Sequence, residues 1–307
     1  MSETPFQLQK ILAPMDFSGH SEAALHRAVA WAKSFHARIT LIHVIGSERL
    51  TGEFTELGIP VATIPDAVKK RLGALATHSK EESLFDPPEV RIGRPEYEIG
   101  FAARELLSDL VVITTHGYTG LDYVLLGGTA EQIIRHTTCP VLVVRRPNGR
   151  APEPKKILVP VGFSGGSLEG LKYGCGLARP FDARVTAVHV VEPFEPAVRL
   201  EVNMQMYEKR LFDVAKSRLQ ELHAEVNEPA GAFETLLQEG TPHAEILETA
   251  RRGEFDLIVM ASLHWTGLGD MFLGRTVEHV LRYAPCPVLI MRGGFSKAAP
   301  KALLSEK

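Results

Sequence analysis

The chain has 307 residues, more than the roughly 100–200 residues of a typical single domain, and this length predicts two domains. Apolar residues make up 45% and charged residues 23%, and the formal net charge of -3 lacks the basic excess of nucleic-acid binders. No run of about 18 apolar residues is present, so we expect no membrane partner. Residues 1–9 lack the layout of a signal peptide, and three cysteines are too few for a disulfide framework, so we expect a cytoplasmic protein.

The first half alternates short apolar segments with segments of helical periodicity. A helical apolar stripe from Ala24 to Ala32 follows the first apolar segment, and Ser18 or Ser21 can cap that helix. Strands that are apolar on both faces and separated by helices predict a parallel sheet covered on both sides, with a ligand crevice at the strands' carboxyl ends. Strands are predicted at residues 11–15, 38–44, 89–92, 110–114 and 141–144, further helices at 67–80, 95–107 and 129–136, and loops or lids at 45–65 and 191–204.

The same pattern returns once in the second half. The matching segments, at offsets of 146 or 147 residues, are 10–14 with 156–160, 41–44 with 187–190, 93–95 with 240–242, and 139–145 with 286–292. So long a period indicates a duplicated domain and not a solenoid repeat. A Pro- and Gly-rich stretch at 146–154 predicts the boundary. We therefore place one domain at 1–147, a second at 154–295 and a tail at 296–307.

Polar residues and glycines follow the strand ends of the first half. The Asp16 carboxylate could accept a hydrogen bond from a ligand's exocyclic amine or sugar hydroxyl, or it could help Ser18 to cap the first helix, and the spacing leaves both readings open. After the fourth strand, Thr114 leads into a loop that closes with Gly127 and Gly128 at a helix start. Glycines let a backbone approach phosphate oxygens, and helix-start N–H groups attract anions, so this loop is a candidate phosphate site. Glycine-rich turns of this kind also occur for steric reasons alone.

In combination, these segments resemble the universal stress protein family. The resemblance is carried by A-P-M-D-F-S at 13–18, H-V at 43–44, G-R-P at 93–95, T-H-G-Y-T-G-L-D-Y-V-L-L-G-G-T-A-E at 115–131 and C-P-V-L-V-V-R at 139–145. It covers nearly the whole chain, once per half. The fold it implies is two tandem five-stranded parallel-sheet α/β sandwiches, Rossmann-like and similar to the adenine nucleotide alpha hydrolases. They would pack as a pseudo-dimer through antiparallel pairing of their last strands.

ATP is the cofactor that the resemblance implies, with or without Mg²⁺. ATP-binding members of the family carry Gly, two residues, Gly, nine residues, Gly, and then Ser or Thr. The corresponding residues here are Thr114, Gly117, Gly127 and Gly128, so two of the four positions match, and Thr129 follows directly.

By the same resemblance, each site residue receives a role toward the nucleotide. Asp16 and Val44 would contact adenosine, and Thr114, His116 and Gly117 would lie against ribose and phosphate through their backbones. Gly127, Gly128 and Thr129 would receive the outer phosphates. The predicted cofactor-binding set, which assigns no catalytic or metal-binding residue, is Pro14, Met15, Asp16, Val44, Thr114, His116, Gly117, Gly127, Gly128 and Thr129.

The second half departs further from that pattern. Gly162 replaces the aspartate, while Ala261 and His264 replace the first two signature glycines. Gly274 is kept, and Arg275 occupies the Ser/Thr position. Two interpretations follow. The second domain is a degenerate repeat kept for structure, or Arg275 and His264 serve another anion or reach across to the first site.

Several other residues are interpreted as structural. Residues 164–167, Ser-Gly-Gly-Ser, read as a tight turn that caps a helix. His43 and His189 occupy matching strand positions and read as core or crevice residues with satisfied hydrogen bonds. Cys139 and Cys286 precede the last strand of each half and read as buried packing residues.

The leading functional hypothesis is an adenine-nucleotide-binding protein that acts in stress response as a nucleotide-dependent switch or adaptor. One alternative is a slow ATPase or phosphotransferase in which His116 orients water, and whether the chain is an enzyme stays open. Another is an interaction scaffold that binds no nucleotide. The expected assembly is a homodimer or the pseudo-dimer within one chain, and the sequence identifies no protein partner.

Overall fold

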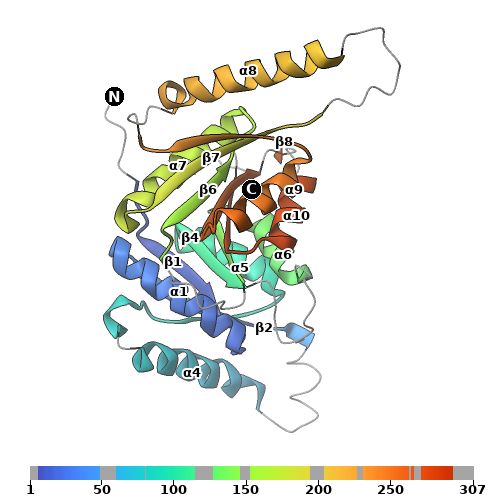
Figure 1. The fold of residues 1–307 in the computed structure, drawn as a ribbon. Coiled ribbons are helices and arrows are strands. Elements are labelled where there is room, and N and C mark those ends of the chain that lie inside the picture. Colours follow the sequence, from blue (N-terminus) through green and yellow to red (C-terminus); the bar gives the residue numbers. More distant parts are fainter. Residues whose placement is uncertain are drawn as a thin grey trace, which may run out of the picture.

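The two halves of the chain build one continuous sheet. The computed structural model describes residues 6–48, 60–79, 81–114, 127–145, 153–193, 204–226, 231–262, 264–265 and 271–292. Each half contributes five strands, and the order across the sheet is β3-β2-β1-β4-β5-β12-β9-β6-β7-β8 (Figure 1). The five strands that each half contributes to this sheet are parallel to one another, which confirms the predicted α/β architecture with two tandem five-stranded units.

The first half follows the predicted order of elements. The helix predicted at 67–80 starts earlier, at Ile64, because Pro65 is tolerated in a first turn that does not need its missing N–H. Of the loop predicted at 45–65, residues 49–59 lie outside the described residues. The elements are β1 (Lys10–Pro14), α1 (Gly19–Phe35), β2 (Arg38–Ile45), η1 (Val61–Thr63), α4 (Ile64–His78), η2 (Glu82–Leu84), β3 (Glu89–Ile92), α5 (Pro95–Glu105), β4 (Leu110–Thr114), α6 (Gly128–His136) and β5 (Val141–Val144).

The second half repeats this order and adds a short antiparallel strand pair, β10 with β11. Of the loop predicted at 191–204, residues 194–203 lie outside the described residues. The elements are β6 (Lys156–Pro160), α7 (Gly165–Phe181), β7 (Arg184–Val191), α8 (Met204–Glu225), β8 (Glu234–Glu239), α9 (Pro242–Arg252), β9 (Leu257–Ser262), β10 (His264–Trp265), β11 (Met271–Phe272), α10 (Arg275–Tyr283) and β12 (Val288–Arg292).

Serine side chains start the first helix of each half, as predicted. Ser18 is the N-cap of α1, and its hydroxyl oxygen accepts a hydrogen bond from the Ser21 N–H at 3.2 Å. Ser164 and Ser167 form a reciprocal capping box at the start of α7. The prediction of a capping turn at 164–167 is therefore confirmed.

Helices cover both faces of the sheet. α1, α4, α7 and α8 pack on one face and α5, α6, α9 and α10 on the other (Figure 1). Leu110, Val111 and Val112, three successive residues of β4, are each 0% exposed, so the strand is buried on both faces. No helix in the described part of the chain is long and apolar enough to span a bilayer.

Antiparallel pairing of the two last strands joins the halves. In β5 and β12, Leu142 pairs with Leu289 at the centre of the register, and both residues are 0% exposed. On one face of this junction, Phe181 of α7 packs against Trp31 and Phe35 of α1, with ring centroids 5.5 and 5.3 Å apart. The halves thus share a buried core, and the expected pseudo-dimer within one chain is confirmed.

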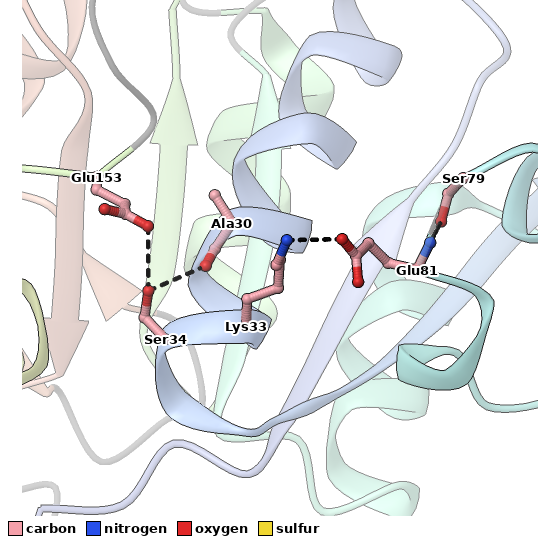
Figure 2. Close-up of polar contacts among 6 residues, drawn as sticks. All are labelled: Ala30, Lys33, Ser34, Ser79, Glu81 and Glu153. Carbon is pink, nitrogen blue, oxygen red and sulfur yellow. Dashed lines mark hydrogen bonds and ion pairs between the residues drawn. The ribbon is translucent and has the colours of Figure 1, made fainter.

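Two side chains at the end of α1, Lys33 and Ser34, make polar contacts with Glu81 and Glu153 elsewhere in the chain (Figure 2). The Ser34 hydroxyl, whose single proton is shared between two acceptors, lies 3.3 Å from the Ala30 carbonyl oxygen and 3.3 Å from Oε1 of Glu153. Glu153 lies just ahead of the second half. Lys33 pairs with Glu81 at 2.6 Å, in the segment that follows α4. The last turn of α1 therefore contacts both the second half and the end of α4.

Removing the shared aromatic contact should destabilise the whole chain. Phe181 is 2% exposed, so Phe181→Ala is expected to lower the free energy of unfolding by about 3–5 kcal/mol. Because one sheet and one core join the halves, urea unfolding should remain a single transition at a lower midpoint. Phe101→Ala, at a position that is 45% exposed, is the control and should change the free energy by at most about 1 kcal/mol. Two separate transitions, with only one of them shifted, would contradict this view.

Candidate functional site

The order of strands in the first half defines one crevice. From β1 the chain proceeds outward to β2 and β3, and then returns to β4 on the opposite side of β1. Ligands of such sheets bind outside the carboxyl ends of the strands at this switch point. Asp16 follows β1, and Thr114 ends β4, so the structure brings both residues to the switch point.

The three other predicted residues of this region lie close by. Pro14 ends β1, and Met15, which is 3% exposed, follows it. Val44 is the penultimate residue of the neighbouring strand β2 and is half-buried. Pro14, Met15, Asp16 and Val44 therefore lie at the carboxyl ends of β1 and β2, and their role toward a ligand stays a prediction.

The Asp16 carboxylate is held in its ionised form by the start of α1. Its Oδ1 accepts hydrogen bonds from the Ser18 N–H at 3.0 Å and the Ser18 hydroxyl at 2.6 Å. Burial alone would raise the pKa of Asp16, but these bonds and one from Ser21 outweigh it, so the pKa lies below its ordinary value of 3.8. Asp16 does support the cap of α1, and it also places a negative charge at the crevice.

The helix α6 begins next to the same crevice. Gly127 is its N-cap, and Gly128 and Thr129, its first two residues, are exposed. Among the described residues, a methyl group added to Gly128 would meet no atom within 4 Å, so these residues leave room beside the helix start. Such a start can receive an anion through its backbone N–H groups. His116 and Gly117, which the sequence also places in the site, lie outside the described residues.

An unpredicted stack of side chains encloses the turn at Asp16. Phe17 lies between the ring of His43, 4.9 Å away between centroids, and the guanidinium of Arg71, 4.1 Å from its centroid. His43 Nδ1 lies 2.6 Å from the Met15 carbonyl oxygen, which satisfies the histidine as predicted. We did not identify Phe17 or Arg71 from the sequence. The available signal was that both residues recur in the second half at the repeat offset.

The equivalent turn of the second half is neutral. Gly162 stands in place of the aspartate, and its N–H donates to the Ser167 hydroxyl at 3.2 Å, as does the Ser164 N–H at 3.1 Å. A buried hydroxyl here takes over the structural role of the carboxylate. Because β5 and β12 run antiparallel, the carboxyl ends of the second set of strands face the opposite way, and α10 with Arg275 begins at that edge. This arrangement disfavours the interpretation that Arg275 reaches across to the first site.

A hollow of about 420 Å³ lies in the second half, away from its switch point between β6 and β9. It lies between the ends of β7 and β8 and the helix α8. Three carboxylates and one lysine line it, so it does not suit a nucleotide polyphosphate. The lining residues are Val191, Glu192, Pro193, Lys209, Leu211, Phe212, Asp213 and Glu239.

Comparison with known proteins decides the family. The model of the universal stress protein family matches the chain twice, at residues 7–145 and 153–292. The chain belongs to the universal stress protein family. Universal stress protein MJ0531 of Methanocaldococcus jannaschii is 35% identical over 140 residues, which span 45% of this chain and 82% of the relative. Universal stress protein MJ0577 of the same organism is 28% identical over 156 residues, which span 46% of this chain and 96% of the relative.

A solved structure shares the tandem fold. A universal stress protein from Archaeoglobus fulgidus superposes with a TM-score of 0.68 at 20% identity, over 94% of this chain and 100% of the other. This likeness concerns the fold alone. The limits at 1–147 and 154–295 and the tail at 296–307 stay predictions, and the tail lies outside the described residues.

The three cysteines of the chain pack in the core, as predicted for Cys139 and Cys286. Cys139, Cys175 and Cys286 are 6%, 3% and 0% exposed. Burial raises the pKa of the Cys139 thiol to about 12, so it is protonated at neutral pH and is no nucleophile there. Within the described ranges, no group of three or more His, Cys, Asp or Glu side chains is arranged to hold a metal ion.

Thiol chemistry tests this burial. The native protein should react with a disulfide reagent at pH 8 far more slowly than the urea-denatured protein, which should release about three equivalents, one for each cysteine. A stoichiometric reaction of Cys139 in the native protein within the mixing time would contradict the burial of that side chain.

Substitution of Ser18 tests the electrostatics of the turn. Ser18→Ala removes the cap of α1 and the hydroxyl that donates to Asp16, while the backbone N–H of residue 18 remains. It should therefore raise the pKa of Asp16 and lower the free energy of unfolding at pH 7 by about 1 kcal/mol. The pKa of Asp16 is lower in the folded than in the unfolded chain. Its carboxylate therefore contributes to the free energy of unfolding above the ordinary pKa of 3.8, and this contribution is lost as the pH falls through the folded-state pKa. The loss of unfolding free energy caused by Ser18→Ala should therefore be smaller at pH 3 than at pH 7.

Ser164→Ala is the matched control, because Ser164 caps α7 beside Gly162, where the carboxylate is missing. The loss of unfolding free energy caused by Ser164→Ala should not become smaller at pH 3 in the same way. Urea titrations at pH 7 and pH 3, together with an NMR titration of Asp16, measure both effects. Identical pH dependence of the two deficits would contradict the role given to Asp16.

Proposed function

We propose that the chain binds ATP in the crevice of its first domain, and that occupancy biases its shape or its affinity for a protein partner in stress response. One observation carries the proposal: an ionised carboxylate, Asp16, stands at the switch point between β1 and β4 in the first half only. A ligand with hydrogen-bond donors at one end and negative charge at the other fits the groups around it.

The adenosine would lie at the β1–β2 edge of the crevice. A carboxylate that accepts two bonds at Oδ1 still has acceptor capacity for an exocyclic amine or a ribose hydroxyl. Pro14, Met15 and Val44 supply apolar surface next to it. This division, with apolar walls and a few placed polar groups, is typical of small-molecule sites.

The phosphates would lie toward α6. Gly127, Gly128 and Thr129 offer backbone N–H groups at an open helix start. Thr114, at the end of β4, would approach the ribose through its backbone, and the proposal assigns His116 and Gly117 to the loop between them. Mg²⁺ would be held mainly by the phosphates, where it would neutralise charge.

The second domain would remain empty of ATP. Gly162 offers no carboxylate, and its N–H is already bonded to Ser167. Arg275 occupies the position at which the family places a hydroxyl residue. We therefore propose one ATP per chain.

The pseudo-dimer already uses the edges of β5 and β12, so a homodimer of two chains would require a different surface. We place the protein in the cytoplasm. ATP can shift the chain from one conformation to another only if it binds the two conformations with different affinity. A protein partner should then bind the ATP-loaded and the ATP-free chain with different affinity.

Calorimetric titration of ATP into the full chain tests the proposal. We expect one site per chain, weakened about tenfold or more in Asp16→Ala, because a hydrogen bond to a charged group contributes about 1.5–3 kcal/mol. Gly162→Ala is the matched control. Its added methyl group meets no atom within 4 Å, so the affinity should not change. Absence of binding at millimolar ATP would contradict the proposal, and turnover that is lost in His116→Ala would instead indicate an ATPase.

A further inference from the structure

The same three-layer stack of side chains occurs in both halves of the chain. In the first half, Phe17 lies between His43 of β2 and Arg71 of α4. In the second, Phe163 lies between His189 of β7 and Arg218 of α8, with 4.2 Å between ring centroids and 5.2 Å from the guanidinium to the ring. Each histidine also binds the backbone, and His189 Nδ1 lies 2.7 Å from the Val161 carbonyl oxygen. The second half therefore repeats the arrangement of the first.

The backbone at the centre of each stack is strained. Phe17 has a φ of 60° and Phe163 a φ of 55°, in the left-handed region that favours glycine and is uncommon for a bulky residue. A glycine would adopt this conformation without strain. Both halves have a phenylalanine here, and its ring makes contacts with an imidazole and a guanidinium that a glycine could not make.

In the first half, this stack holds the residue that the proposed function depends on. His43 binds the carbonyl of Met15, on one side of Asp16, and the ring of Phe17 is held on the other side. The carboxylate itself is fixed to Ser18. The turn at Asp16 is therefore held by β2 through His43 and by α4 through Arg71.

α4 is also anchored by contacts other than that of Arg71 with Phe17. Leu72 is 0% exposed and packs into the core beneath the helix. Beyond its last turn, the Ser79 hydroxyl accepts a hydrogen bond from the Glu81 N–H at 3.2 Å, and Glu81 pairs with Lys33 of α1 (Figure 2). Arg71 thus connects an independently anchored helix to the crevice.

We propose that Arg71 and Phe17 are positioning residues that couple α4 to the nucleotide site. The contact of Arg71 with Phe17 keeps Asp16 in its ligand-binding position, and an occupied site in turn favours the docked position of α4. This inference rests on the proposed function, and it names α4 as the element through which occupancy is transmitted. Coupling between two sites is reciprocal, so a change that releases α4 must weaken the ligand, and the ligand must stabilise α4.

Two variants of the full chain separate the side-chain contact from the backbone. Arg71→Ala removes the cation above the ring and should weaken ATP binding about two- to fivefold, with Arg71→Lys restoring most of the affinity. Phe17→Gly relieves the positive φ but removes the ring, so affinity should fall although the strain is gone. A purely local backbone role would give the opposite result for Phe17→Gly.

Arg218→Ala is the matched control, because it breaks the same contact beside Gly162, where the carboxylate is missing. It should leave ATP affinity unchanged. The readout of coupling is amide hydrogen exchange. ATP should increase the protection of residues 64–78 in wild type, and Arg71→Ala should abolish most of that increase. Thermal melts verify that each variant is folded, and Arg71→Gln replaces Arg71→Ala if the latter is not.

The outcomes are distinguishable. Wild type that binds no ATP overturns the proposed function and this inference with it. Wild type that binds ATP, with unchanged affinity in Arg71→Ala and no effect of ATP on exchange in α4, overturns the inference alone. An equal loss of affinity in Arg218→Ala also overturns it, because the effect would then be one of general stability.

Discussion

The antiparallel pairing of β5 with β12 is the constraint on which the rest of the structure depends. Leu142 and Leu289 meet at its centre, fully buried, so two edges that would otherwise be exposed become the middle of one sheet. Aromatic packing of Phe181 against α1 closes one face of the junction. Since the pairing reverses the strand direction, the two crevices open at opposite edges of the sheet. The two halves share one core, and each has its own crevice.

The two halves have similar backbones but different side chains in the turn before the first helix. Each starts its first helix with a capping serine and holds the preceding turn with an Arg–Phe–His stack. In the first half, the turn carries Asp16, whose charge is stabilised by Ser18. In the second it carries Gly162, and the hydroxyl of Ser167 serves the same backbone. The first turn thus carries a carboxylate, and the second carries a glycine whose N–H is bonded to a serine hydroxyl.

Much of the fold could be predicted from the sequence, because burial on both faces leaves continuous apolar strands. The segment Cys-Pro-Val-Leu that returns at residues 286–289 already indicated β5 and β12 as equivalent strands. The stack was missed for a physical reason. Arg71 approaches Phe17 only after α4 docks, and neither periodicity nor composition indicates a left-handed φ at a phenylalanine. The roles of all the predicted site residues toward a nucleotide stay predictions, and on the phosphate side His116 lies outside the described residues.

The central claim is that two equal folds in one chain divide into one nucleotide site and one structural partner. The most direct measurement is a crystal structure of the full chain grown with a non-hydrolysable ATP analogue. The account predicts one nucleotide per chain, with its adenosine against Asp16 and its phosphates at the start of α6. Equal occupancy of both crevices, or a nucleotide bound only beside Gly162, would contradict it.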